Sequence, residues 1–162
     1  MTQTASFPAE LEREPVRLVH PDLATRECAC SSLRAATRSV TQLYDDALRP
    51  FDLKATQFSL LTAVRAQGPV TIKRLAEAGV MDRTTLTRNL RPLERRGWVR
   101  IVRGTDRRER VVHLSREGQR ILEQAMPAWR LAQRRMSELL GGSRLERMLK
   151  DLAATVEATW TA

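Results

Sequence analysis

The sequence predicts a mainly α-helical protein that carries one small β-hairpin. In six stretches, apolar residues recur at spacings of three and four, which is the spacing of one face of an α-helix. Two short β-like runs near residue 105 flank a Gly-Thr-Asp turn, as the strands of a hairpin would. Apolar residues make up 42% of the 162 residues, so the chain can bury a core.

The N-terminal part is expected to be an arm followed by one long helix. Residues 1–21 contain three prolines and no helical periodicity, which favours an extended arm. Asp22 or Thr25 can cap a first helix within residues 22–50, and Pro50 ends it. The apolar face of this helix consists of Leu33, Ala36, Val40, Leu43 and Ala47.

Three shorter helices and a hairpin follow. The second helix is expected at residues 57–66, and the third ends near Gly79 after a cap at Thr71. Asp82 caps a fourth helix over residues 83–96, in which Pro92 is expected to cause a kink. The hairpin strands are expected at residues 98–103 and 110–114. Two helices joined by a short turn and followed by a hairpin have the layout of a winged helix-turn-helix.

The C-terminal part is expected to form two further helices. Ser115 caps the fifth helix, and Pro127 is expected to kink it. Gly141 and Gly142 end it, and Ser143 with Glu146 predicts a capping box for the sixth. The apolar seams are Leu122, Ala125, Trp129, Ala132, Met136 and Leu139 in the fifth helix, and Leu145, Leu149, Leu152 and Val156 in the sixth.

The charge of the chain indicates a polyanionic partner. Its formal net charge is +9, and most of the positive charge is arginine. The planar guanidinium of arginine matches phosphate and guanine edges, so nucleic acid is the first candidate and an anionic membrane surface the second. No apolar run is long enough to span a bilayer and no signal-peptide core is present, so we expect a soluble, cytoplasmic protein.

The fourth helix separates an apolar face from a basic one. Leu86, Leu90 and Leu93 share one face, and arginines and threonines lie opposite. Arginine can donate two hydrogen bonds to guanine, and threonine can reach phosphates, base edges or a thymine methyl group. A solvated amphipathic face is the alternative interpretation. Within this helix and the hairpin, the residues expected to bind DNA are Arg83, Thr84, Thr85, Thr87, Arg88, Arg91, Arg107 and Arg108.

The hairpin has the features of a basic wing. Alternation along its second strand turns Val112 and Leu114 toward the core, while its turn projects Arg107 and Arg108. A narrow minor groove attracts inserted arginines. Asp106 is expected to support the wing by an ion pair with the Arg108 guanidinium. A merely solvated loop is again the alternative.

An ordered set of short motifs runs from the fourth helix through the wing. They read Asp82-Arg-Thr-Thr-Leu-Thr, Leu93-Glu-Arg-Arg-Gly97-Trp-Val99, Asp106-Arg-Arg108 and Leu114-Ser115-Arg-Glu-Gly118. This set resembles the MarR family of bacterial transcriptional regulators, and the likeness extends from about residue 33 to residue 152. The resemblance implies a homodimer, usually a repressor, that binds a pseudo-palindromic operator in double-stranded DNA. One departure is Lys54, where family members often carry a threonine cap.

The resemblance also implies a division of the chain. Residues 1–21 form the arm, and residues 22–50 a dimerisation helix. Residues 51–114 form the winged helix-turn-helix lobe, and residues 115–162 the C-terminal dimerisation helices. An obligate-type dimer through the N- and C-terminal helices agrees with their long apolar seams.

The two cysteines, Cys28 and Cys30, predict neither a disulfide framework nor a metal site. They lie about 200° apart around a helix, and the only histidines are His20 and His113, so no zinc site is expected. No catalytic triad, phosphate loop or cofactor motif is present, so we expect no enzyme. Both thiols can be ordinary buried core residues.

Regulation is predicted from the resemblance alone. Cys30 aligns with the reactive cysteine of hydroperoxide-sensing members and Tyr44 with a tyrosine partner of that thiol, although Arg34 replaces another partner. Family members often bind small aromatic acids, for which Tyr44, Phe51 and Phe58 are candidate crevice residues. We therefore expect a repressor that a small aromatic effector or thiol oxidation releases from DNA. The alternative is an architectural DNA-binding protein without an inducer.

Overall fold

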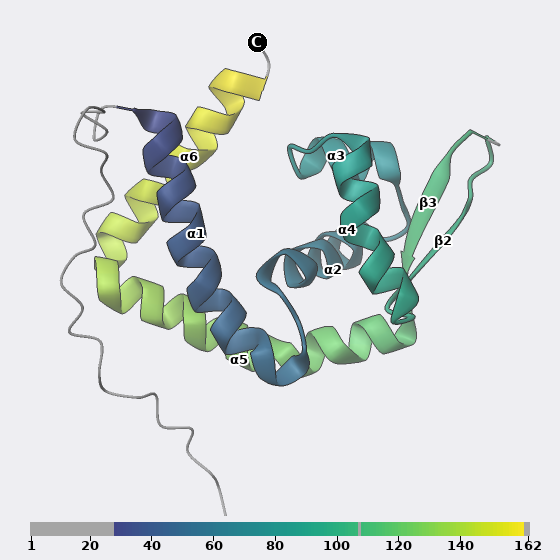
Figure 1. Ribbon diagram of the computed structural model, residues 1–162, viewed down its shortest axis with the longest axis horizontal. Coiled ribbons are helices and arrows are strands. Elements are labelled where there is room, and N and C mark those ends of the chain that lie inside the picture. The colour runs from purple at the N-terminus through teal and green to yellow at the C-terminus, as the bar shows by residue number, and fades with distance from the viewer. Residues whose placement is uncertain (1–27, 107, 161–162) are drawn as a thin grey trace, which may run out of the picture. The chain divides into compact units, whose positions relative to one another are not determined.

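The computed structural model describes residues 28–106 and 108–160, which form α-helices and one small antiparallel sheet (Figure 1). The predicted fold class is confirmed. Its elements are α1 (Ala29–Leu48), η1 (Arg49–Phe51), α2 (Ala55–Gln67), β1 (Val70–Thr71), α3 (Ile72–Ala78), α4 (Arg83–Arg95), β2 (Val99–Arg103), β3 (Arg110–Leu114), α5 (Arg116–Leu140) and α6 (Gly142–Trp160).

The first helix ends where the sequence indicates. The predicted arm and the predicted caps Asp22 and Thr25 lie outside the described residues. The end of α1 at Leu48 is followed by the short 3-10 helix η1, whose first turn contains Pro50. Proline is tolerated there because the first residues of a helix need no amide donor.

The N-terminus of α2 is capped by a residue that the sequence does not point to. Lys54 offers no side-chain acceptor, and its own amide donates to Gln57 Oε1 at 3.0 Å. The next amide, of Ala55, donates to Asp45 Oδ1 at 2.7 Å. The carboxylate of Asp45 also lies 3.4 Å from Lys54 Nζ. A carboxylate from the end of α1 thus replaces the missing threonine cap.

The sheet contains three strands, one more than the hairpin that the sequence predicts. Its order is β1-β3-β2, and β3 pairs antiparallel with both neighbours. The additional strand, β1, has two residues, and Val70 is paired with Val112. A run this short carries no alternation that a sequence pattern can detect.

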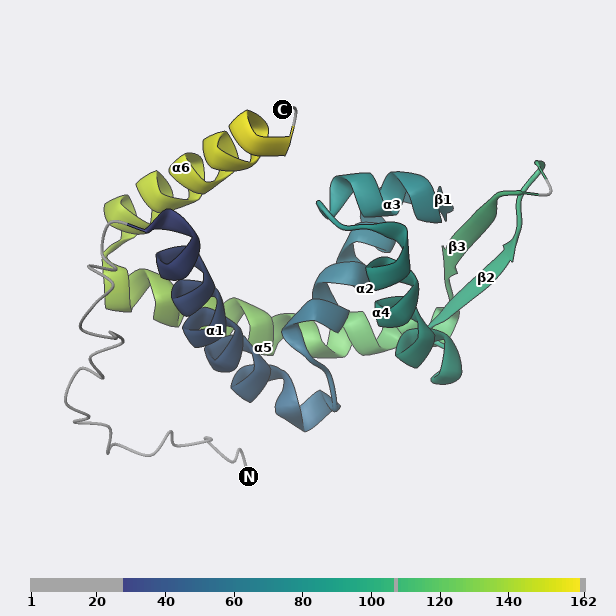
Figure 2. The same cartoon turned by 45° about the horizontal axis from the view of Figure 1, so that its top comes forward.

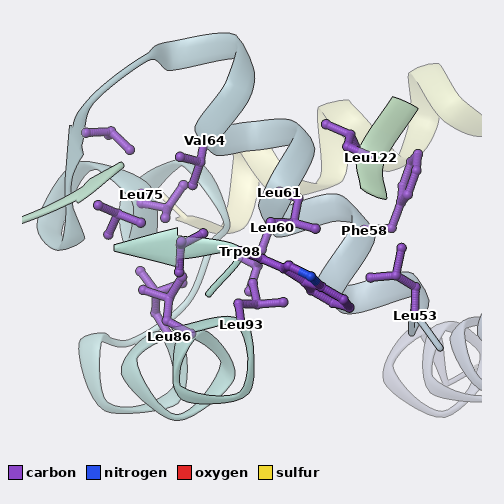
Figure 3. Close-up of a cluster of buried hydrophobic side chains, with 14 of the residues drawn as sticks. Leu53, Phe58, Leu60, Leu61, Val64, Leu75, Leu86, Leu93, Trp98 and Leu122 are labelled. Carbon is purple, nitrogen blue, oxygen red and sulfur yellow. The ribbon is translucent and has the colours of Figure 1, made fainter. Parts of the chain in front are cut away.

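The core lies where α2, α3, α4 and the sheet meet the first half of α5 (Figure 3). Leucines from four helices are almost inaccessible to solvent in it. The side chains of Leu61, Leu75, Leu86, Leu90, Leu93 and Leu122 each have an exposed fraction of 0 or 1%. Val112 from β3 is equally buried, as its alternation predicts. This packing fixes α4 and the hairpin to one body.

The last two helices leave apolar side chains exposed. Along α5, Leu122, Ala125, Ala132 and Met136 are buried as predicted, but Leu139 is 56% exposed. On α6, Leu145 is buried, whereas Leu149 and Val156 are 50% and 43% exposed. Each of α4 and α5 continues through its proline as a single helix, so the kinks remain predictions.

The predicted capping box of α6 is wrong. The helix begins at Gly142, so Ser143 lies inside its first turn. The amide of Leu145 donates to the Gly141 carbonyl at 3.0 Å, and the helix starts two residues before the predicted point. Glu146 instead forms an ion pair with Lys150 at 2.8 Å.

Candidate nucleic-acid interface

Helix α4 is fixed at its N-terminus by a side-chain cap. Asp82 Oδ1 accepts a hydrogen bond from the Thr85 amide at 2.8 Å, as the sequence predicts. Hydrogen bonds from the Thr85 side chain and amide hold the pKa of Asp82 below its usual value. The same carboxylate also interacts with the Thr84 amide, and the partial positive charge of the helix N-terminus favours an anion beside it.

The outer face of α4 carries cations without carboxylate partners. Arg83, Thr84, Arg88, Arg91 and Arg95 are exposed, and Thr85 and Thr87 are half-buried. Among residues 28–106 and 108–160, no ion pair is recorded for the four arginines. Within these ranges, no carboxylate neutralises the positive charge of this face.

One threonine of this face is held by the helix itself. Thr87 Oγ1 donates to the Arg83 carbonyl at 2.7 Å, which fixes the hydroxyl proton. The lone pairs and methyl group of Thr87 remain for contacts outside the helix. Thr84 and Thr85 lie one turn nearer the N-terminus.

The wing consists of β2, β3 and the turn between them (Figure 1). Arg108 is exposed at the turn, and Arg107 lies outside the described residues. Asp106 Oδ1 accepts from the backbone amide of Arg108 at 2.9 Å. This hydrogen bond shapes the turn. The predicted ion pair between Asp106 and the Arg108 guanidinium is not recorded among the described residues.

A tight contact joins the base of the wing to α5. Ser115 Oγ donates to the Gly97 carbonyl at 2.6 Å and accepts from the Gly118 amide at 2.9 Å. A Cβ atom on Gly118 would lie 2.0 Å from the Trp98 carbonyl oxygen. Only glycine permits this approach, which accounts for the glycine in the Leu114–Gly118 motif.

Arg96 is a positioning residue that the sequence analysis did not single out. Its guanidinium lies 4.7 Å from the centroid of the Trp98 ring and 2.5 Å from Asp52 Oδ2. It also donates to the Asp52 carbonyl at 2.7 Å. Arg96 thereby ties the C-terminal end of α4 to the loop before α2. Its place next to Gly97 and Trp98 was the signal that could have found it.

The cysteines and the candidate crevice residues lie in different environments. Cys28 and Cys30 are free thiols and exposed, so they are not core residues of this chain. Tyr44 is half-buried, its hydroxyl donates to Gln133 Oε1, and burial raises its pKa. Phe58 is 3% exposed and stacks on Trp129, with ring centroids 5.9 Å apart.

These positions bear on the predicted effector site. Phe58 has no free surface to offer a ligand, and Phe51 is half-buried against the core. A cavity of about 500 Å³ opens instead at the start of α5, with Arg65, His113 and Arg116 in its lining. The three aromatic residues named from the sequence do not line that cavity.

The described residues contain neither a membrane-spanning helix nor a cluster of metal ligands. None of their helices combines the length and the apolarity that crossing a bilayer requires. In the same ranges, no three histidine, cysteine or acidic residues converge as metal ligands.

Comparison with known proteins decides the family. The MarR family model matches residues 53–109. The crystal structure of the Mycobacterium tuberculosis transcriptional regulator MosR in complex with DNA is 39% identical, with a TM-score of 0.72, and the match covers 82% of this chain and 98% of that one. The chain belongs to the MarR family. In this MarR-family chain, α3 and α4 form the helix-turn-helix, and β2 with β3 forms the wing.

Two curated relatives of this MarR-family chain agree with that assignment. The uncharacterized HTH-type transcriptional regulator YwoH of Bacillus subtilis is 32% identical over 92 residues, which are 57% of this chain and 67% of the relative. The multiple antibiotic resistance protein MarR of Salmonella typhimurium is 36% identical over 84 residues. That match covers 51% of this chain and 58% of the relative. The first of these relatives is named as a transcriptional regulator, and the second carries the name of the family.

Proposed function

We propose that this chain is a sequence-specific DNA-binding repressor that acts as a homodimer on a pseudo-palindromic operator. The observation that carries the proposal is the outer face of α4, whose four exposed arginines have no carboxylate partner among the described residues and whose N-terminus is capped by Asp82. The similar MosR structure, which is a complex with DNA, supports the same partner class for this chain.

In this proposal, α4 enters the major groove. Arg88 and Arg91 donate to base edges, with guanine as the preferred partner because it accepts two hydrogen bonds from one guanidinium. Arg83, at the start of the helix, binds a phosphate, which the partial positive charge of the helix N-terminus also attracts. Thr84, Thr85 and Thr87 contact phosphates or thymine methyl groups from the same face.

The wing supplies the second contact, in the minor groove. Arg107 and Arg108 enter that groove, where negative potential is strongest when the groove is narrow. The hydrogen bond that the Arg108 amide donates to Asp106 Oδ1 supports the turn that presents the Arg108 side chain.

Exposed apolar residues support the dimer. Leu139, Leu149, Val156 and Trp160 are all more than 40% exposed on α5 and α6. A second copy that covers them would remove this apolar surface from water. A two-fold symmetric dimer presents two α4 helices to half-sites about 34 Å apart, one turn of the DNA helix.

The proposal includes release of the repressor by a signal. A small aromatic effector is one candidate, and oxidation of Cys30 is the other. Cys30 is exposed in the first turn of α1, so an oxidant can reach its sulfur atom, which reacts as the thiolate. A hydroperoxide would transfer one oxygen to this thiolate, which gives sulfenic acid and an alcohol.

The test of DNA recognition starts by selecting an operator from a random duplex library. The parent protein should prefer that duplex to random DNA by about 10³-fold or more. Arg88→Ala or Arg91→Ala should weaken binding by about 1–3 kcal/mol, while Arg147→Ala on α6 serves as the control. If both α4 variants bind like the parent, α4 does not read bases. A parent without sequence preference would instead indicate an architectural DNA-binding protein.

The test of release compares two thiol variants. Mild organic hydroperoxide should release the parent from the operator, and reductant should restore binding. Cys30→Ser should bind DNA normally and ignore the oxidant, while Cys28→Ser should respond like the parent. Release of Cys30→Ser at parental peroxide concentrations would exclude Cys30 as the sensor and leave the aromatic effector. Loss of response in both variants would mean that the thiols act together.

A further inference from the structure

Two arginines lie directly opposite each other on the two strands of the wing. In the register of β2 and β3, Arg103 is the direct partner of Arg110. Residues paired in this way have Cβ atoms about 4.5–5.5 Å apart on the same side of the sheet. Both side chains are exposed. The pair Arg103 and Arg110, called the rung below, therefore places two positive charges side by side next to the turn.

This rung is unfavourable for the free protein. Like charges directly opposite each other destabilise an antiparallel pair. Across the described part of the chain, no ion pair to either guanidinium is recorded that would offset the repulsion. The turn beyond the rung is closed by a backbone bond from Gly104 to Glu109 at 3.1 Å, so the two arginines stay in register.

The rung lies on the face of the hairpin that turns toward the helices. Side chains alternate along a strand, so Arg103 shares a face with Ile101 and Val99. Val99 is buried, and Ile101 packs against the core. The hairpin extends past α3 and α4, which leaves the end of this face uncovered (Figure 2). The rung is thus the last pair of this face before the turn, beyond the side chains that pack against the core.

We propose that Arg103 and Arg110 together bind one DNA phosphate, between the major-groove contact of α4 and the minor-groove contact of the wing tip. This inference rests on the proposed function. A strand that passes from one groove to the next presents its backbone to this face. A single phosphate between two guanidiniums accepts hydrogen bonds from both and cancels their repulsion. The pair positions the wing without reading sequence.

The experiment measures the salt dependence of binding to the selected operator duplex. Relative to the parent, the double variant Arg103→Gln/Arg110→Gln should lose roughly fivefold in affinity and about 0.9 in the slope of log K against log salt, the value for one phosphate. The control is Arg100→Gln, because Arg100 is exposed on the opposite face of β2, paired with His113. It should change the slope by much less.

A melting curve of the free protein separates binding from folding. The single variants Arg103→Gln and Arg110→Gln should each melt at the parental temperature or up to about 2 °C above it, because the repulsion between the two arginines is relieved. If the double variant loses about twice the expected slope, the two arginines bind two separate phosphates. If it loses no slope, or only as much as Arg100→Gln, there is no phosphate site. Either result overturns the inference. If the parent shows no operator preference, or if Arg88→Ala and Arg91→Ala both bind like the parent, the proposed function itself fails.

Discussion

Replacement of Gly118 by alanine should destabilise the protein, although alanine is the better helix former. Gly118 lies in the first turn of α5, where the exchange by itself would stabilise the helix by about 1 kcal/mol. The added Cβ would lie 2.0 Å from the Trp98 carbonyl oxygen and 2.8 Å from Leu114 Cδ1. The closest of these contacts is to backbone, which no side-chain rotation can relieve.

The expected loss in the free energy of unfolding follows from the displacement of α5 that the added Cβ requires. The added Cβ overpacks the contact between α5 and the Trp98 backbone, and such overpacking typically costs about 1–3 kcal/mol. The same shift weakens the Ser115 cap, whose loss costs about 1 kcal/mol. After the gain in helix propensity is subtracted, the free energy of unfolding should fall by about 2 kcal/mol. For a chain of this length, the melting temperature should fall by about 4–8 °C.

Thermal melting followed by circular dichroism at a fixed protein concentration measures this shift. Gly142→Ala is the matched control, because Gly142 is also in the first turn of a helix and a Cβ added to it would have Ser137 Oγ, at 3.5 Å, as its nearest neighbour. It should melt at or slightly above the parental temperature. A Gly118→Ala variant that melts as high as the parent would refute the steric argument.

Three further outcomes are expected. Asp82→Ala should lower the melting temperature at pH 7. Because the folded-state pKa of Asp82 is depressed, its stabilisation is present above the unfolded pKa of about 4 and lost as pH falls through the folded pKa, so the difference should vanish in acid melts. Tyr44→Phe leaves Gln133 Oε1 without its donor, so the free energy of unfolding measured with denaturant should fall by about 1 kcal/mol. Because burial raises the pKa of Tyr44, the parent should lose stability above about pH 10, and the variant should lose less. Arg108→Ala should weaken operator binding in fluorescence anisotropy at an unchanged melting temperature, and unfolding instead would assign Arg108 a structural role.

The sequence predicted correctly those features that depend on residues close together in the chain. Asp82, Thr71 and Ser115 were expected to cap helices, and each accepts the amide three residues on. The leucines of α4 are buried because spacings of three and four place them on one side of the helix. Gly97 has a φ of +69°, which a glycine after a helix allows without strain. These features depend on residues within one or two turns.

Contacts between distant segments were decided by the tertiary structure alone. The Asp45 cap of α2, the Arg96 pair with Asp52 and the bond from Tyr44 to Gln133 join residues 10, 44 and 89 positions apart. The facing pair Arg103 and Arg110 depends in the same way on the register of the hairpin. Periodicity reports which side of an element is apolar, but it carries no information about which other element will cover that side. The covering element is decided only when the core packs. Burial of apolar surface is non-directional, so it favours whichever arrangement of all the helices and strands packs most closely.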